Sequence, residues 1–553
     1  MSNMTVSNLT TQVVIVGGGP AGLMLALELG RRNVRCVLFN DGPSTTNQPQ
    51  ANATQARTME HFRRLGFADA VRDLGLPADY PTDITYFTRY SHHELARFAL
   101  PTRDEAKAMA HGLTGSWSAA ELPHRCSQMY IERVLHQQVQ ALPSVTLMYG
   151  WRVGEVLIEA KGVDVKATEA GGQGVCHVSA DYVAGCDGPR SLVRTKLDIT
   201  YAGSSGAVRN FFGGRMHAVY FRSTEFYDVV NRPKAWMYWA FNRERRSFIA
   251  AINGRDEFAF HTQLSDDEND TLISDVQAEE MVCQTMGCEF DFEVISRGSW
   301  TAGFALVAEK MSAGRAFLLG DAAHLFTPAG GLGYNTAIED AVNLGWKLAA
   351  VIQGWGGYDL LASFDAERRP AAQRNTGYAR DFADSIGLYS AAPGLEDDSP
   401  QGVRLRTEAG AYLDAHARAE FDIPGITFGT RYDASPIVVG DGTQPPPDTA
   451  NKYVPTACPG GRAPHAWLSE SQSLYDLFGF DFTLLRFGRE QGEELIDIAQ
   501  AIGAPLTVVD LDNPDFRALY QADLALIRPD QVVAWRGNSV DDAYAIWQQV
   551  RGA

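Results

Sequence analysis

The 553-residue chain lacks the features of secreted and membrane-embedded proteins. Its seven cysteines are scattered and form no Cys-x-x-Cys pair, which is typical of a reducing cytoplasm rather than a disulfide framework. No apolar run approaches the roughly 20 residues of a membrane-spanning helix. Residues 1–11 have neither the basic nor the apolar region of a signal peptide. We therefore predict a cytoplasmic protein without membrane contacts.

Excess positive charge and metal-ligand spacing are also missing. The chain carries 48 Lys and Arg against 67 Asp and Glu, a net charge of −19, which argues against a nucleic-acid or anionic-membrane partner. His92 and His93 are adjacent, whereas a helical zinc pair would be four residues apart. We expect neither bound nucleic acid nor a metal.

A nucleotide-binding pattern stands near the N-terminus. The apolar, β-branched run Val13–Val16 predicts a buried parallel strand. Gly17, Gly19 and Gly22 follow in GxGxxG spacing, which allows a tight turn, a close approach to a pyrophosphate, and close packing of helix on strand. The helix expected over Ala21–Arg31 would direct its N-terminal amides at the phosphate.

The next strand, expected over Val34–Phe39, ends at Asn40. An acidic residue usually holds a ribose at this position. Asn40 can still form hydrogen bonds, so we predict that it binds the adenosine ribose. This stretch alone does not distinguish FAD from NAD.

Two later segments carry further signals. In "YVAGCDGPRSLVRTKL", residues 182–197, Asp187 stands at a strand–turn–helix junction, where it could meet amides or a ribose. In Gly314–Ala349, a strand over Ala316–Leu319 ends at Gly320 and Asp321, and a Pro-Ala-Gly-Gly-Leu-Gly loop then opens a helix. Asp321 could accept from a ribityl hydroxyl, and the loop would offer free amides to a planar, electron-rich ring.

These motifs, in this order, resemble the class A flavoprotein monooxygenases, the single-component aromatic hydroxylases with the para-hydroxybenzoate hydroxylase fold. "HRCSQMYIERVL", residues 124–135, and "SFDAERRP", residues 363–370, are similar to further segments of that family. The resemblance covers residues 12–380 and implies FAD rather than NAD. It also implies NADPH or NADH as a transient reductant, since no second GxGxxG is present.

The resemblance assigns FAD contacts position by position. The residues concerned are Gly17, Gly19, Pro20, Ala21, Gly22, Asn40, Gln50, Arg57, Arg125, Gln128, Asp187, Asp321, Pro328, Gly331, Gly333, Tyr334 and Asn335. Pro328 would lie over the flavin face, and the last four would line the pyrimidine edge through backbone amides. Two departures stand out: Asn40 replaces the family's Glu, and Gln50 stands where some relatives have an Arg. We expect Arg57 to compensate in part for the second change.

The implied fold is α/β with three parts. Residues 1–200 and 301–400 would form a Rossmann-like FAD-binding domain, and residues 201–300, with part of 80–120, an inserted antiparallel substrate-binding sheet. Residues 401–553 would form a C-terminal thioredoxin-like domain, because "PGGRAPHAWL" and "LIRPDQVVAWR" resemble the phenol hydroxylase subgroup. Without a Cys-x-x-Cys pair it cannot do dithiol chemistry, so we interpret it as a scaffold. The resemblance is also compatible with a homodimer, since this domain often makes dimer contacts in relatives.

The substrate pocket is predicted from an aromatic strand, "AWMYWAFN". Trp236 and Tyr238 alternate with Met237 and Trp239, so the first two face one side of the sheet and the last two the other. We favour the Trp236 and Tyr238 face, with Pro328, as the pocket. No Arg pair for a carboxylate is evident, which favours a neutral phenol or a larger polycycle.

The sequence does not identify a catalytic base. Asn52 stands where some relatives have an acid or a His, and it cannot deprotonate a phenol. The candidates are His217 and Tyr238, whereas His324, near Asp321, is expected to support the loop.

The resemblance implies a monooxygenase that hydroxylates a phenolic ring through a C4a-hydroperoxyflavin. A halogenase would show a WxWxIP segment, which is absent. The residues are also compatible with a flavin oxidoreductase, with an oxygenase of a non-phenolic or polyketide-type substrate, and with a flavin-bearing protein without catalytic activity.

Overall fold

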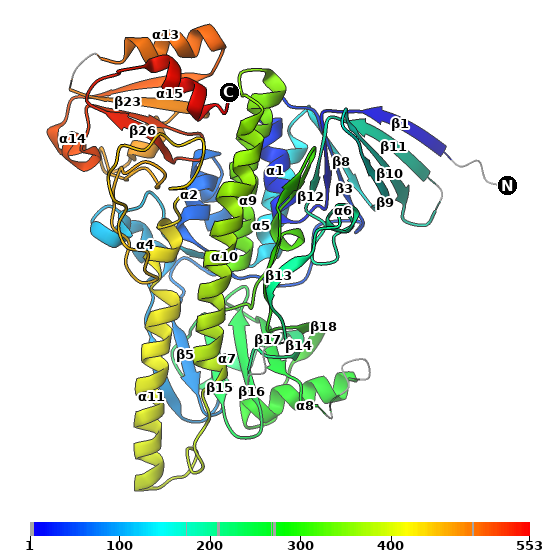
Figure 1. The fold of residues 1–553 in the computed structure, drawn as a ribbon. Coiled ribbons are helices and arrows are strands. Elements are labelled where there is room, and N and C mark those ends of the chain that lie inside the picture. Colours follow the sequence, from blue (N-terminus) through cyan, green and yellow to red (C-terminus); the bar gives the residue numbers. More distant parts are fainter. Residues whose placement is uncertain (1–4, 173, 207–210, 267, 269–272, 489–490) are drawn as a thin grey trace.

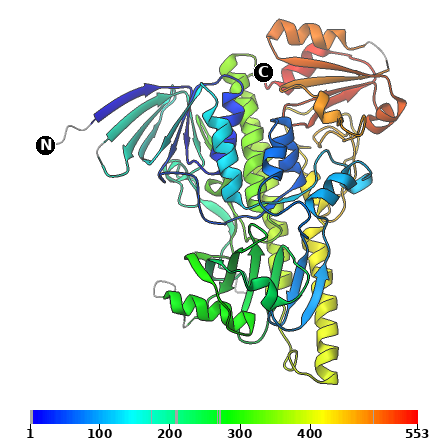
Figure 2. The same ribbon diagram turned by 180° about the vertical axis from the view of Figure 1, so that it is seen from behind.

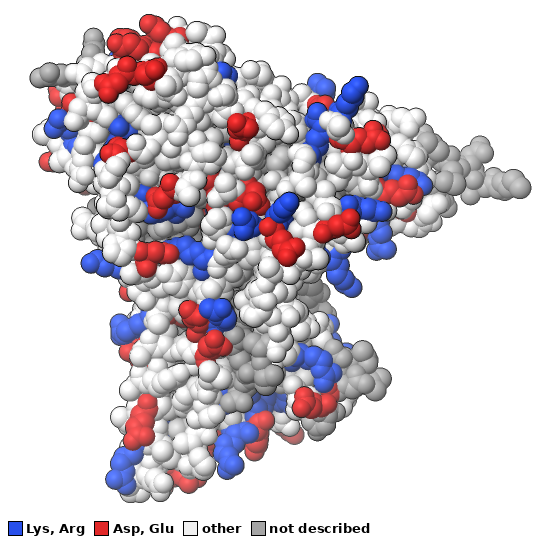
Figure 3. Space-filling view, viewed as in Figure 1, with Lys and Arg blue, Asp and Glu red and all other residues white. Residues whose placement is uncertain are grey.

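The structure is a computed structural model that describes residues 5–172, 174–206, 211–266, 268, 273–488 and 491–553. The two long helices α9 (Leu332–Gln353) and α10 (Asp359–Gly387) run through its middle. The C-terminal domain lies on one side of them and the N-terminal strand on the other, as the opposite views of Figure 1 and Figure 2 both show. Acidic and basic side chains are mixed over the face in Figure 3.

A largely parallel sheet forms the first domain, in the order β20-β21-β12-β2-β3-β8. Its strands are β20 (Ser312–Ala313), β21 (Ala316–Leu318), β12 (Tyr182–Gly185), β2 (Val13–Val16), β3 (Cys36–Asn40) and β8 (Val145–Tyr149). Helix α1 (Pro20–Gly30) contacts both α9 and α5 (Gln128–Gln140). The predicted strand–turn–helix–strand unit is confirmed, with the second strand starting two residues later than expected.

A second, four-stranded sheet flanks the first, in the order β1-β11-β10-β9. Its strands are β1 (Thr5–Thr10), β11 (Gly174–Ala180), β10 (Val163–Glu169) and β9 (Trp151–Ile158). The polar N-terminal segment therefore forms an edge strand, parallel to β11.

A seven-stranded sheet carries the predicted substrate-binding strands, in the order β18-β14-β17-β16-β15-β5-β6. Its strands are β18 (Glu293–Thr301), β14 (Arg215–Arg222), β17 (Glu257–Gln263), β16 (Arg246–Ala251), β15 (Met237–Phe241), β5 (Ile84–Phe87) and β6 (Glu94–Phe98). We call the face that carries Tyr238 the rear face and the face that carries Trp239 the front face.

Packing shows where each face points. On the rear face, Tyr238 packs against Phe226 of α7 (Phe226–Val230), with ring centres 5.3 Å apart. On the front face, Tyr220 and Ala259 share a hydrophobic cluster with Met129 of α5. The front face therefore turns toward the FAD-binding domain.

The C-terminal sheet has the order β24-β23-β25-β26, with only β23 and β24 parallel. Its elements are β23 (Phe482–Phe487), β24 (Leu506–Leu511), β25 (Leu524–Ile527), β26 (Val533–Gly537), α13 (Glu493–Ile502), α14 (Pro514–Tyr520) and α15 (Ala543–Val550). This arrangement confirms the α/β C-terminal domain, and all seven cysteines are free thiols. However, α11 (Pro400–Phe421) packs against β5 and β6, so residue 401 is too early a start for this domain.

Shorter elements connect these layers. They are α2 (Ala56–Arg64), α3 (Ala68–Arg72), α4 (Arg103–Ala110), α6 (Leu192–Lys196), α8 (Asp275–Met286), α12 (Pro424–Phe428), β4 (Ala53–Thr54), β7 (His124–Arg125), β13 (Tyr201–Ser204), β19 (Ala305–Ala308) and β22 (His324–Leu325). Among the described residues, no helix is long and apolar enough to cross a bilayer, and no group of three or more His, Cys, Asp or Glu is placed to hold a metal.

Candidate functional site

The glycine turn between β2 and α1 leaves room for a ligand at one position only. A Cβ on Gly17 would lie 2.1 Å from the carbonyl oxygen of Cys186, and one on Gly22 would lie 2.0 Å from that of Gly17. A Cβ on Gly19 would meet nothing within 4 Å. Gly19 is also the N-cap of α1, and no side chain caps this helix end. The free backbone N–H groups of this helix end, such as that of Ala21, suit a pyrophosphate, and Pro20 in the first turn has no N–H to leave unpaired.

Asn40 holds the glycine turn from the end of β3. Its Oδ1 accepts from the Gly18 amide at 3.1 Å, and its Nδ2 donates to the Gly42 carbonyl at 3.2 Å. One N–H and one acceptor position of the side chain remain available. The structure thus places Asn40 beside the turn, and its contact with a ribose stays a prediction.

Asp187 follows β12 next to the same turn. Its Oδ2 accepts from the amides of Leu192 and Val193 at 2.7 and 3.3 Å, at the start of α6. Its Oδ1 is buried and has no protein partner, and burial raises the pKa of the carboxyl. An unpartnered buried acceptor is costly unless a donor reaches it, so this oxygen fits a ligand hydroxyl.

Arg125 lies in β7, and Gln128 is the first residue of α5. The Arg125 guanidinium lies 4.2 Å from the centre of the Trp236 ring and has no hydrogen-bond acceptor or acidic partner in the described part of the chain. Burial lowers its pKa to about 10, so it stays cationic at neutral pH. The Gln128 amide donates to Glu132 at 2.8 Å and to Gln50 at 3.3 Å. A buried cation without a counterion suits the pyrophosphate predicted there.

The loop before α9 is clamped by Asn335. Its Oδ1 accepts from Gln55 and Thr58 at 2.8 and 2.7 Å. Its Nδ2 donates to the carbonyls of Gly331 and Ala53 at 2.6 and 2.9 Å. The Asn335 side chain is therefore saturated and fixes the loop, which leaves only backbone amides for a flavin.

Those amides belong to an open helix end. Gly331 has φ +63°, a left-handed conformation that favours glycine, and no side chain caps the α9 N-terminus that it begins. Gly333 and Tyr334 lie in the first turn, and Pro328 is exposed just before it. The site would thus receive the electron-rich edge of a planar ring.

Asp321 and its surroundings also fit a cofactor. The Asp321 side chain is exposed, yet desolvation by the surrounding protein raises the pKa of its carboxyl. Behind it, His324 Nε2 lies 2.7 Å from Asp340 Oδ2, and Arg368 donates to Asp340 Oδ1 at 2.8 Å. Asp340 also accepts from the Gly320 amide at 3.2 Å. His324 therefore supports the loop, as expected.

Arg57 does not reach this site, which corrects the sequence-based expectation. Its guanidinium donates to Glu60 at 3.0 Å, to the Gln531 side chain at 2.6 Å and to the Asp530 carbonyl at 2.6 Å. The partners at 530 and 531 lie far away in the sequence, so no local pattern could reveal them. Arg57 joins α2 to the C-terminal domain.

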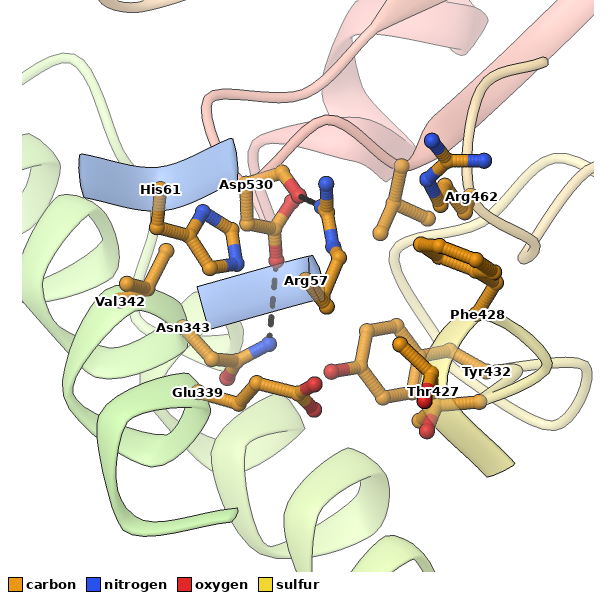
Figure 4. A pocket seen from close by; sticks show the side chains of 12 residues that line it. Arg57, His61, Glu339, Val342, Asn343, Thr427, Phe428, Tyr432, Arg462 and Asp530 are labelled. Carbon is orange, nitrogen blue, oxygen red and sulfur yellow. Dashed lines mark hydrogen bonds between the residues drawn. The ribbon is translucent and has the colours of Figure 1, made fainter. Parts of the chain in front are cut away.

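A polar cavity opens at that junction, and Arg57, His61, Asn343 and Asp530 line it (Figure 4). His61 Nδ1 and Asn343 Oδ1 are buried without protein partners. The cavity lies beside α2 and α9 rather than at the glycine turn, so it is distinct from the nucleotide site.

His217 and Tyr238 lie on the rear face of the large sheet, which contradicts their proposed catalytic role. The Tyr238 hydroxyl accepts from the Ala235 amide at 2.7 Å, and burial raises its pKa to about 12. His217 Nδ1 lies 3.1 Å from the Ser299 hydroxyl. Trp236, which directly precedes β15, contacts Arg125, one of the predicted FAD-binding residues.

The front face instead carries an aromatic row that the sequence did not reveal. The row consists of Tyr86, Trp239, Phe248, His261 and Trp300, with successive ring centres 6.2, 5.0, 4.6 and 6.0 Å apart. Tyr86 pairs with Trp239, Trp239 with Phe248, and Phe248 with His261 in the strand register. The row therefore depends on pairing between strands that are distant in the sequence. Alternation within a single strand shows only which of its residues share a face.

Four polar atoms in the aromatic row are buried without partners. They are the Tyr86 hydroxyl, Trp239 Nε1, His261 Nδ1 and Trp300 Nε1. Burial lowers the pKa of His261 to about 4, so its imidazole is neutral at pH 7. Flat apolar rings that also offer hydrogen-bonding atoms suit a planar aromatic ligand with polar substituents.

Comparison with known proteins agrees with this geometry. An FAD-binding-domain family matches residues 10–379, and the C-terminal family of aromatic-ring hydroxylases matches residues 456–551. The chain is 33% identical to the FAD-dependent monooxygenase apdD of Emericella nidulans, over 96% of this chain and 88% of that protein. It is 28% identical to the aklavinone 12-hydroxylase RdmE of Streptomyces purpurascens, over 95% of each.

A solved structure matches along the whole chain. RebC with bound 7-carboxy-K252c superimposes with a TM-score of 0.89 at 33% identity, over 99% of this chain and 100% of that one. The glycine turn, the open helix ends and the unpaired Arg125 fit the FAD that this family binds. The chain therefore belongs to the FAD-binding aromatic-ring hydroxylases and is an FAD-dependent monooxygenase.

Proposed function

We propose that this enzyme hydroxylates a phenolic aromatic compound with several fused rings, using NADPH or NADH as reductant. The observation that carries the proposal is the aromatic row, which runs from β5 to β18 across six strands on the face turned toward the FAD-binding domain. A single phenol ring would cover only part of it. The activity named for RdmE, hydroxylation of aklavinone, supports an extended substrate.

Bound FAD would supply the redox chemistry, which is the activation of O₂ and the transfer of one oxygen atom to the ring. The chain supplies binding and orientation. The amides around Gly19 would hold the pyrophosphate, with Arg125 neutralising its charge. Asp321 would accept from a ribityl hydroxyl, and the amides of Gly333 and Tyr334 would hold the ring edge.

Asn335 and Asp340 act as positioning residues. Asn335 ties the Gly331 loop to β4, and Asp340 ties the Gly320 turn to His324 and Arg368. The Asn335 side chain uses both of its N–H groups and both of its acceptor positions in these and the Gln55 and Thr58 bonds. Preorganised loops of this kind hold reacting groups in place without a reorganisation cost during the reaction.

We propose His261, instead of His217 and Tyr238, as the candidate for an acid–base role. Its neutral imidazole lies in the aromatic row, and its Nδ1 has no protein partner. It can hydrogen-bond a phenol hydroxyl and orient the ring. A pKa of about 4 makes it a weak base, so we assign it orientation of the substrate rather than full deprotonation.

Phe211 and Phe212 would help to exclude water. Their rings meet Trp239 edge-on, with centres 5.8 Å away in both cases. Both side chains are buried. Aromatic rings thus already pack on the row, which supports its use as a surface for further rings.

The test is an assay of NAD(P)H oxidation, O₂ uptake and product mass with purified holoenzyme. The panel compares simple phenols with hydroxylated naphthalenes, anthraquinones and tetracyclic phenols. We expect substrate-stimulated NAD(P)H oxidation and a mono-oxygenated product with the larger rings. Oxidation that no substrate stimulates, and that yields only hydrogen peroxide, would overturn the proposal.

A further inference from the structure

Arg246 is a cation without an acidic partner on the front face of the substrate sheet. It opens β16 and lies in register with Phe241, whose ring centre is 5.9 Å from its guanidinium carbon. Within the described chain, no carboxylate lies within ion-pair distance of Arg246, and its guanidinium donates no hydrogen bond. Its Nη1 is buried, and desolvation lowers the pKa of the side chain.

The neighbouring arginine shows how unusual this is. Arg245 pairs with Glu268 and donates to Gln284 at 2.9 Å. The chain has 19 more acidic than basic residues, so carboxylates are plentiful. A half-buried guanidinium with an unused donor carries a desolvation penalty, which an incoming anion would remove.

Arg246 lies well away from the flavin loop. Phe382 of α10 lies against Gly330, 3.2 Å from the position of a Cβ there. Tyr389, just past the end of the same helix, packs on Phe241 with ring centres 5.5 Å apart. Seven residues at a helical rise of 1.5 Å separate these points by about 10 Å. A ligand that reaches both must be longer than one benzene ring.

We propose that Arg246 binds a carboxylate at the end of the fused-ring substrate that is remote from the flavin. This inference rests on the proposed function and makes it more specific. The carboxylate accepts two hydrogen bonds from the guanidinium fork, while the rings lie along the aromatic row. The expected substrate thus changes from the neutral phenol favoured by the sequence to a polycycle that carries a negative charge.

The experiment measures binding, so it does not depend on turnover. Anthracene-2-carboxylate and anthracene-2-carboxamide, which differ in charge but hardly in shape, are titrated into FAD-loaded enzyme. Quenching of tryptophan fluorescence reports binding, since Trp239 and Trp300 lie in the row. Benzoate serves as the short ligand. The variants are Arg246→Gln and Arg246→Lys, with the exposed Arg243→Gln as the matched control.

We expect the wild type to prefer the carboxylate over the carboxamide and to bind benzoate weakly. Arg246→Gln should weaken carboxylate binding by about tenfold to a hundredfold and leave carboxamide binding nearly unchanged. Arg246→Lys, which keeps the charge, should retain part of the preference, and Arg243→Gln all of it.

Equal affinity of the wild type for the two anthracenes would overturn the inference. An equal loss for both ligands in Arg246→Gln would also overturn it, because it would show a structural role. Failure of the proposed function would be seen in the turnover assay and not in this binding experiment, because no fused-ring phenol would yield an oxygenated product.

Discussion

The guanidinium of Arg125 lies 4.2 Å from the centre of the Trp236 ring. This contact joins β7, which precedes the helix predicted to bind FAD, to the residue just before β15, the strand predicted to bind substrate. Both side chains are buried, and the described chain offers Arg125 no acceptor. The cation is thus held by an aromatic face on one side and is free to meet an anion on the other.

Replacing Arg125 with Gln should therefore weaken FAD binding. Loss of a charged hydrogen-bond donor to a phosphate costs about 1.5–3 kcal/mol, which corresponds to roughly tenfold to a hundredfold in Kd. Trp236→Leu should have a smaller effect of the same sign. Flavin fluorescence during titration of the apoprotein measures both. The exposed Arg133 on the following helix α5 provides a control, Arg133→Gln; an equal loss in that variant would contradict the assignment.

Substitution of two glycines of the turn should have different effects. Gly22→Ala puts a Cβ about 2.0 Å from the Gly17 carbonyl oxygen, so the backbone must move and the apoprotein should lose about 1–3 kcal/mol. Gly19→Ala meets no protein atom and should leave the Tm of the apoprotein unchanged. It should nevertheless weaken FAD binding, because the Cβ enters the space assigned to the pyrophosphate. If Gly19→Ala bound FAD with normal affinity, the pyrophosphate could not lie at this turn.

Glu367 should be essential for stability. The buried carboxylate accepts from Lys347 at 2.6 Å and from Arg528 of the C-terminal domain at 2.6 and 2.8 Å. Removing one partner of a buried ion pair costs about 3–5 kcal/mol, so Glu367→Gln should lower the Tm strongly. Arg369→Gln removes a more exposed pair with Asp365 and should change stability by less than about 1 kcal/mol. Similar Tm values for the two variants would refute this difference.

Stability should fall as the pH decreases from about 6.5 to 4. Burial, with a smaller contribution from His217, lowers the pKa of His261 to about 4, whereas an unfolded histidine has a pKa near 6.5. The unfolded chain therefore takes up a proton in this interval before the native protein does, which favours unfolding. The contribution is at most about 3 kcal/mol.

Thermal unfolding between pH 4 and 7 tests this point. His261→Gln should show a shallower decrease in Tm with falling pH than the wild type. His177→Gln, at an exposed position of β11, should keep the wild-type slope. Identical slopes in all three proteins would mean that His261 is not held neutral in the folded state.

Local sequence predicted the nucleotide-binding part of the fold well. The strand, glycine turn and helix around Gly17 depend on neighbours within about 30 residues, so their pattern is readable. Asp321 and the Gly331 loop were predicted from the family resemblance, and the structure gives them an uncapped helix end. Arg125 was predicted for the same reason, but its contact with Trp236 was not.

Features set by distant pairing escaped the sequence. Alternation in β15 gave the two faces, yet only the packing of α7 and α5 decided which of them turns toward the flavin. Tyr238 and His217 were therefore assigned to the wrong side. Arg57 was misplaced because its partners are Asp530 and Gln531. The unpaired state of Arg246 is likewise a property of the folded sheet.

The most direct test of the central claim is a turnover experiment under ¹⁸O₂ with a hydroxylated fused-ring aromatic and NAD(P)H. We predict one ¹⁸O atom in each product molecule and one NAD(P)H oxidised for each product formed. Product that carries oxygen from water, or NAD(P)H oxidation that yields only labelled hydrogen peroxide with every ring system tested, would contradict it.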